Sequence, residues 1–72
     1  MENTLWTLEL NHSATIVRLC CAGAMRRRLM DLGFTEGETV CKLLENRGMA
    51  AYLIRGTLIA LRRCDADDIL IS

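Results

Sequence analysis

The sequence predicts a mainly β protein, a small barrel of about five short strands with a short α-helix inserted after the first long strand. Its 72 residues are expected to form a single domain over residues 1–72, because a chain this short supports only one small core. Runs rich in β-branched and aliphatic residues alternate with turn residues, which is the pattern of short strands. Closure into a barrel is expected because it removes exposed strand edges.

The first strand follows an N-terminal run of uncertain type. The run from Thr4 to Leu10 holds several leucines, but it is too short to distinguish a strand from a helical turn. The next run, Ala14 to Cys20, contains three β-branched residues and is predicted to be a strand, because such residues favour extended backbone. The dipeptide Ala22-Gly23 interrupts this run and should end the strand.

A short amphipathic helix is predicted from Ala24 to Leu32. Its apolar residues recur at i, i+4 and i+7, which places them on one helical face that should pack into the core. These residues are Met25, Leu29 and Leu32. Gly33 stands where a glycine commonly ends a helix in the left-handed conformation, and Phe34 should then pack back on the helix.

The remaining strands follow in close succession. A turn over Thr35–Glu38, with Gly37 at positive φ, should lead into them. Gly56 between two β-rich runs indicates a tight hairpin. Asp65–Asp68 is expected to form one turn of helix, with its acids near the positive end of the backbone dipole. The predicted strands are Glu38–Glu45, Ala50–Arg55, Thr57–Arg62 and Ile69–Ile71.

Charge and hydropathy exclude several classes of function. Nine basic residues balance nine acidic residues, whereas nucleic-acid binders usually carry a basic excess, so no nucleic-acid partner is expected. The longest apolar runs are far shorter than the roughly 18 residues of a membrane-spanning helix, so no direct membrane insertion is expected. Because the N-terminus also lacks the features of a secretory signal, a cytoplasmic location is predicted.

The triple arginine of the predicted helix is the candidate partner-binding site. Successive helical residues are about 100° apart, so Arg26, Arg27 and Arg28 fan around the helix and cannot form one phosphate-binding patch. A phosphate loop also places its glycines before a helix, whereas here Gly33 follows it. The arginines either solvate the helix or contact a protein partner, since arginine is enriched at protein interfaces.

The sequence contains no set of residues typical of an enzyme. The single histidine, His12, lies in a polar loop, and no nucleophile, base and orienting group can be assembled around it. Neither catalysis nor a cofactor is expected. The cysteines form no CxxC pair and are expected to act as small hydrophobic residues, with a cysteine-based metal or redox sensor as the alternative. They are Cys20, Cys21, Cys41 and Cys64.

The segment from Arg27 to Val40 resembles the RxLxxLGxxxGxxV signature of the FeoA family. The resemblance extends from Leu5 to Ile71, through the opening leucines and a closing pattern of a glycine, an Ile-Ala-Leu-Arg segment and alternating isoleucines. The sequence departs from the family's usual residues at Ser13, at Glu36 and in the loop Asn46–Met49. The closing pattern is formed by Gly56, Ile59-Ala60-Leu61-Arg62, Ala66, Ile69 and Ile71.

This resemblance implies an SH3-like small β-barrel and the role of a small cytoplasmic accessory protein of bacterial ferrous iron transport. The partner that it implies is FeoB, a membrane permease with a cytoplasmic GTP-binding portion, which the protein would regulate without carrying iron itself. The same barrel occurs as the C-terminal domain of DtxR-like metal-dependent repressors. No helix-turn-helix precedes it in this sequence, so a DNA-reading repressor is not expected.

Overall fold

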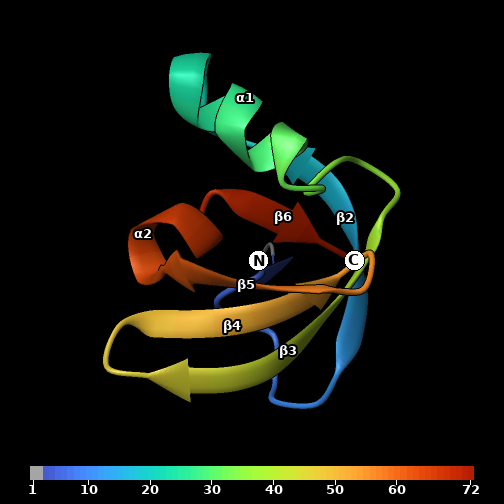
Figure 1. The fold of residues 1–72 in the computed structure, drawn as a ribbon, viewed down its shortest axis with the longest axis vertical. Coiled ribbons are helices and arrows are strands. Elements are labelled where there is room, and N and C mark those ends of the chain that lie inside the picture. Colours follow the sequence, from blue (N-terminus) through green and yellow to red (C-terminus); the bar gives the residue numbers. More distant parts are fainter. Residues whose placement is uncertain (1–2) are drawn as a thin grey trace.

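The computed structural model describes residues 3–72, and Figure 1 shows them as a curled sheet with helices at its margins. Within this range six strands form one antiparallel sheet in the order β1-β6-β2-β3-β4-β5. The predicted mainly β fold with a short inserted helix is confirmed. Its elements are β1 (Asn3–Thr4), β2 (Ser13–Leu19), α1 (Gly23–Asp31), β3 (Thr39–Asn46), β4 (Met49–Ile54), β5 (Thr57–Arg62), α2 (Arg63–Ala66) and β6 (Ile69–Ile71).

The strands arise from alternating burial along the chain. On β4, Ala50, Tyr52 and Ile54 are buried while the residues between them are exposed or half-buried, as expected for a strand with one face on the core. The N-terminal run that the sequence left undecided forms the two-residue β1 and then a series of turns. This short strand pairs with β6 and brings the number of strands in the described range to six.

Side chains from the long strands and from α1 meet in one core. Tyr52 and Phe34 are its largest fully buried members, and Leu5 reaches it from the N-terminal segment. Because the sheet curls, its concave face surrounds these residues from several sides. The buried apolar residues are Leu5, Ile16, Leu19, Leu29, Phe34, Val40, Ala50, Tyr52, Ile54, Leu61, Ala66 and Ile69.

Two hairpins in the described range have turns of the same kind. Arg47 and Gly48 join β3 to β4, Arg55 and Gly56 join β4 to β5, and all four residues have positive φ, between 40° and 83°. Such turns match the twist of the strands that they connect. The tight hairpin predicted at Gly56 is confirmed, and an equivalent turn at Gly48 occupies the loop where the sequence departs from the FeoA pattern.

Two local predictions are wrong. Leu32, predicted to pack in the core, is 38% exposed, because α1 ends at Asp31 and the following turn directs Phe34 into the core instead. The helical turn predicted over Asp65–Asp68 is α2, which begins earlier, at Arg63. There the Arg63 N–H donates a hydrogen bond to the Gly48 carbonyl at 2.8 Å, next to the last pair of the β4–β5 ladder, Met49 and Arg62.

Candidate partner-binding surface

The C-terminus of α1 is closed by a Schellman motif. The Gly33 N–H donates to the Met30 carbonyl at 3.0 Å, and the Phe34 N–H donates to the Leu29 carbonyl at 2.9 Å, which are the two bonds of this motif. Gly33 has a φ of +111°, which glycine adopts without the steric cost of a Cβ atom. The predicted glycine stop is thereby confirmed.

Among residues 3–72 no helix combines the length and the apolar character needed to cross a membrane.

α1 packs on the barrel through one narrow face. Figure 1 shows it at the margin of the molecule, beside the end of β2. Leu29 is buried, and Met25 packs against the core from the same face. Apart from the half-buried Arg26, the other residues of the helix are exposed and therefore accessible to a partner.

The three arginines of the candidate site differ in their surroundings. Arg26 is half-buried, and its Nη1 donates to the Leu19 carbonyl at 3.2 Å, which ties α1 to the end of β2. Arg27 and Arg28 are exposed, and neither forms an ion pair with a carboxylate of the described residues. Their guanidinium groups are therefore available to a carboxylate of another molecule.

A groove of about 370 Å³ lies between α1 and β5. Met25, Arg28 and Leu32 line its helical side, and Ile59 and Leu61 of β5 line the opposite side. A wider depression of about 620 Å³ lies against α1 and the residue that follows it, but it is more open to solvent. The groove is the better defined of the two, since it has walls from two elements. Apolar residues line it together with Arg28, Arg62 and Asp65, and a mixture of apolar side chains and arginine is typical of protein interfaces.

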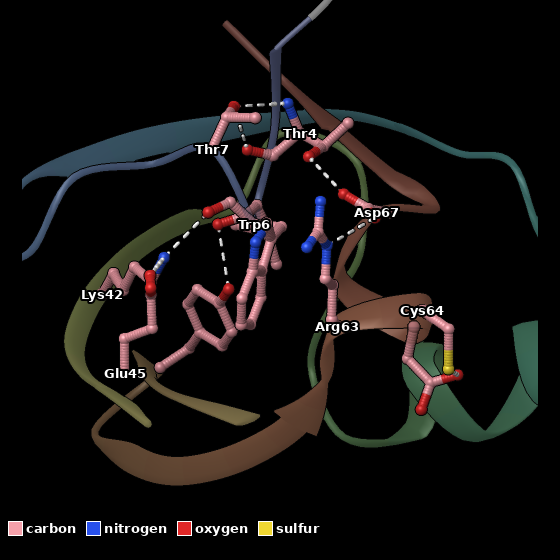
Figure 2. A network of polar contacts seen from close by, with 11 residues as sticks. Thr4, Trp6, Thr7, Lys42, Glu45, Arg63, Cys64 and Asp67 are labelled. Atoms are coloured by element: carbon pink, nitrogen blue, oxygen red, sulfur yellow. Dashed lines mark hydrogen bonds and ion pairs between the residues drawn. The ribbon is translucent and has the colours of Figure 1, made fainter. Parts of the chain in front are cut away.

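A second set of polar side chains surrounds a buried lysine. Lys42 on β3 is 1% exposed, and its Nζ donates to the Trp6 carbonyl at 2.8 Å and pairs with the Glu45 carboxylate. The same Nζ lies 4.8 Å from the centre of the Trp6 ring, within the range of a cation–π interaction. Figure 2 shows Trp6 between Lys42 and Arg63, whose guanidinium carbon lies 5.4 Å from the same ring.

Further hydrogen bonds hold the N-terminal segment at this place. The Tyr52 hydroxyl donates to the Leu5 carbonyl at 2.9 Å. Burial raises the pKa of Tyr52 well above its usual value, and the carboxylates of Glu45 and Asp67 raise it further. Thr4 Oγ1 donates to Asp67 Oδ1 at 3.2 Å, as Figure 2 shows. These groups bond to one another across the chain, so they act as a structural clamp on the N-terminal segment.

The sequence reasoning missed this clamp, although one signal could have revealed part of it. Side chains two residues apart on a strand share a face, so Lys42 had to point inward together with the buried Val40. Trp6 offered no such signal, because it lies in the run whose structure the local sequence did not determine.

The four cysteines lie on different parts of the fold. Cys20 and Cys21 follow β2, Cys41 lies on β3 and Cys64 lies in α2. Cys20 and Cys64 are exposed, unlike the small buried hydrophobic residues that were expected. Cys21 packs against the core while its neighbour Cys20 faces solvent, so these two thiols point in different directions. In the described part of the chain, no group of three or more His, Cys, Asp or Glu side chains could hold a metal ion.

Comparison with known protein families identifies the group to which this fold and surface belong. The sequence matches the FeoA domain family over residues 3–72. The chain belongs to the FeoA family. FeoA domains are small accessory domains associated with ferrous iron transport, so the resemblance seen in the sequence is confirmed. The extent of a single domain over residues 1–72 stays a prediction. No functionally curated protein matches the sequence at a significant level.

Solved FeoA structures have the same fold. One of them is FeoA of Stenotrophomonas maltophilia in complex with zinc, described as an SH3 domain protein and a candidate bacterial ferrous iron transport activating factor. Its sequence is 27% identical to this one, and the two structures superpose with a TM-score of 0.87 over 97% of this chain and 89% of that chain. FeoA of Chlorobium tepidum is 28% identical with a TM-score of 0.83, over 99% and 68% of the two chains. A manganese-dependent transcriptional repressor shares the fold alone, with 21% identity and a TM-score of 0.89 over 99% of this chain and 36% of the repressor. The SH3-like barrel is therefore confirmed.

Proposed function

We propose that this chain is an accessory protein of ferrous iron uptake that binds the cytoplasmic GTP-binding portion of a FeoB permease and modulates transport without catalysing a reaction itself. The observation that carries the proposal is the exposed side of α1, where neither Arg27 nor Arg28 has an ion-pair partner within the described residues and Arg28 lines the groove between α1 and β5. The association of FeoA domains with ferrous iron transport supports the permease as the partner.

The exposed side of α1 and the residue after it supply both components of a protein interface. Arginine can form two parallel hydrogen bonds with one carboxylate, which suits Arg27 and Arg28 to acidic side chains of a partner. Met30 on α1 and Leu32 directly after it are 41% and 38% exposed and add apolar contact area beside the arginines. Exposure of Leu32 is unfavourable in the free protein, and covering it on binding would contribute to affinity.

Calorimetric titration of the full chain with the purified GTP-binding portion of the permease tests the proposal. We expect binding, with the double variant Arg27→Glu/Arg28→Glu weakening it by about tenfold or more through charge reversal. The matched control is Arg18→Glu, which reverses an exposed arginine on β2 outside the groove and should leave the affinity unchanged.

Melting temperatures of all three proteins establish that the variants are folded. Absence of binding both with and without a guanine nucleotide would refute the proposed partner. An equal loss of affinity in the Arg18 control would instead refute α1 as the binding surface, because the effect would then reflect net charge.

A further inference from the structure

The outer face of the β3-β4-β5 sheet is apolar although it faces solvent. An antiparallel sheet with one face on a core usually presents polar residues on the other. Here four large apolar side chains are substantially exposed on the solvent side. They are Leu44 at 62%, Leu58 at 54%, Met49 at 41% and Leu53 at 40%.

Strand register arranges this face in rows that cross the three strands. One row is Leu44, Ala51 and Ala60, and the next row is Cys41, Leu53 and Leu58. We call these six residues the outer rows. A shallow depression of about 120 Å³ lies over Ala51 and Ala60, beside the larger Leu44 and Met49.

A β-bulge contributes to this arrangement. The register of β3 against β4 shifts between Lys42 and Leu44, so Leu43 is the extra residue. Without the shift, Leu44 would share the inward face of Lys42, since residues two apart lie on one face. Bulges commonly re-aim a side chain in this way, and here the bulge turns a leucine into solvent.

The outer rows are self-complementary in size. Each strand carries one large and one small residue in the two rows: Leu44 and Cys41 on β3, Leu53 and Ala51 on β4, and Leu58 and Ala60 on β5. Consider a second copy stacked face to face on this surface, related by a twofold axis that is parallel to the sheet, perpendicular to the strands and halfway between the two rows. This axis brings each strand of one copy over the same strand of the other. Every large residue then faces a small one.

We propose that this face binds a second copy of the chain, face to face about that twofold axis, an association that does not depend on the proposed permease partner. Isologous contacts of this kind need a surface that complements itself. In the pair, Leu58 of one copy lies over Ala60 of the other, Leu53 lies over Ala51, and Leu44 lies over Cys41. The depression over the alanines receives the leucines.

The charged residues around this face are compatible with a second copy of the chain as the partner. The outer rows contain no charged residue. Arg62, in the neighbouring row, pairs with Asp65 at 3.3 Å, and Arg55 at the β4–β5 turn pairs with Glu38 at 3.9 Å. An uncharged centre with internally paired charges beside it does not repel an identical surface, and it offers little attraction to a charged partner.

The size of the face indicates a weak association. With three strands about 4.8 Å apart and two rows of outward residues about 6.8 Å apart along each strand, the face covers about 200 Å² per copy. A standard stable interface buries about 800 Å² per partner. The dimer should therefore form in the upper micromolar range and be absent from dilute samples.

Sedimentation velocity of the full chain, from about 10 μM to about 1 mM, tests the proposal across the range expected for so small an interface. We expect the wild type to shift from monomer toward dimer. Ala60→Leu places leucine against leucine and should weaken association about tenfold, since overpacking is destabilising. The size swap Leu58→Ala/Ala60→Leu restores one large and one small residue on β5 and should restore association.

Val17→Glu is the matched control, because it changes an exposed apolar residue of β2 outside the outer rows and should associate as the wild type does. A wild type that stays monomeric at every concentration would overturn the proposal, and so would an Ala60→Leu variant that associates more strongly. Monomeric protein that cosediments with phosphatidylcholine vesicles would also overturn it, and would assign the face to a membrane surface.

Discussion

Lys42 shows how a single residue joins two distant parts of this chain. Its aliphatic stem lies in the core while its Nζ bonds to the Trp6 carbonyl and to Glu45. A buried ammonium group is costly unless it is paired, and here the carbonyl, the carboxylate and the Trp6 ring offset that cost together. The buried ammonium group therefore depends on Trp6 staying in place. In turn, Lys42 stabilises the position of the N-terminal segment that carries Trp6.

Two leucines of the α1 region should differ in their contribution to stability. Leu29→Ala should lower the free energy of unfolding by about 2–5 kcal/mol, because it leaves a cavity in the core. Leu32→Ala should cost less than about 1 kcal/mol, since its side chain is already 38% exposed. Thermal or urea unfolding of both variants measures the difference. Equal losses would mean that α1 packs with a different face.

Tyr52 should make the stability of the protein depend on pH in the alkaline range. Its raised pKa means that the folded state keeps the phenolic proton where the unfolded state has lost it. The folded state then binds more protons, so stability is fully present below about pH 10, the usual pKa of tyrosine, and falls as the pH rises above it.

Urea unfolding of the wild type and of Tyr52→Phe over this pH range isolates the contribution of Tyr52. The variant should lose about 1 kcal/mol near neutral pH, because the hydrogen bond to the Leu5 carbonyl is absent. Its further loss above pH 10 should be shallower than that of the wild type. Parallel curves would assign the alkaline instability to other groups.

At the scale of elements, glycines and turns set the boundaries of the helix and hairpins. Gly33 ends α1 in a conformation that places its Cα close to Arg55, where a Cβ atom would lie 3.2 Å from the arginine Cδ. The two hairpins instead place an arginine first in a turn that requires positive φ, a conformation that non-glycine residues adopt at some cost. Asparagine and aspartate are the residues preferred there.

Arg47→Asn should therefore stabilise the protein by about 0.5–1 kcal/mol, since asparagine tolerates the left-handed conformation of this turn better. Arg47 suits this test better than Arg55, which packs over Gly33. Arg18→Asn is the control, because it removes an exposed arginine of β2 that does not lie in a turn. It should not stabilise the protein. A melting temperature of Arg47→Asn at or below the wild-type value would contradict the interpretation of turn strain.

Local patterns made most elements predictable and left others out of reach. The α1 stop at Gly33 and the hairpin at Gly56 follow from backbone requirements that only a few residues meet, so the sequence alone indicated them. The exposure of Leu32 could not be predicted, because helical periodicity places it on the core face and only the later course of the chain excludes it. The clamp on Trp6 depends on contacts 36 residues apart, between Lys42 and Trp6, which no local pattern encodes.

For the whole molecule, the N-terminal segment completes the barrel. Leu5 is fully buried, its N–H donates to the Ile69 carbonyl at 2.9 Å, and its carbonyl accepts the Tyr52 hydroxyl. The segment thus contributes to the core and to the hydrogen bonds of two other elements. Leu5 and its neighbours should therefore contribute much of the stability of the fold.

Deletion of residues 1–8 should lower the melting temperature by at least about 10 °C, because the loss of Leu5 from the core alone costs about 2–5 kcal/mol. Differential scanning calorimetry measures the change. Leu10→Ala is the control, since Leu10 lies in the same region but is 48% exposed. A truncated chain that melts like the wild type would show that the segment only covers a barrel that is stable without it.

The pairing of β1 with β6 places Asn3 opposite Ile71. The two ends of the described chain therefore lie on neighbouring strands of the sheet. A module with adjacent ends can be inserted into a loop of another protein, or rejoined end to end and opened elsewhere, without stretching either partner. A manganese-dependent transcriptional repressor contains the same fold as about a third of its chain. Neighbouring chain ends are a feature that makes such use of the fold within a larger protein possible.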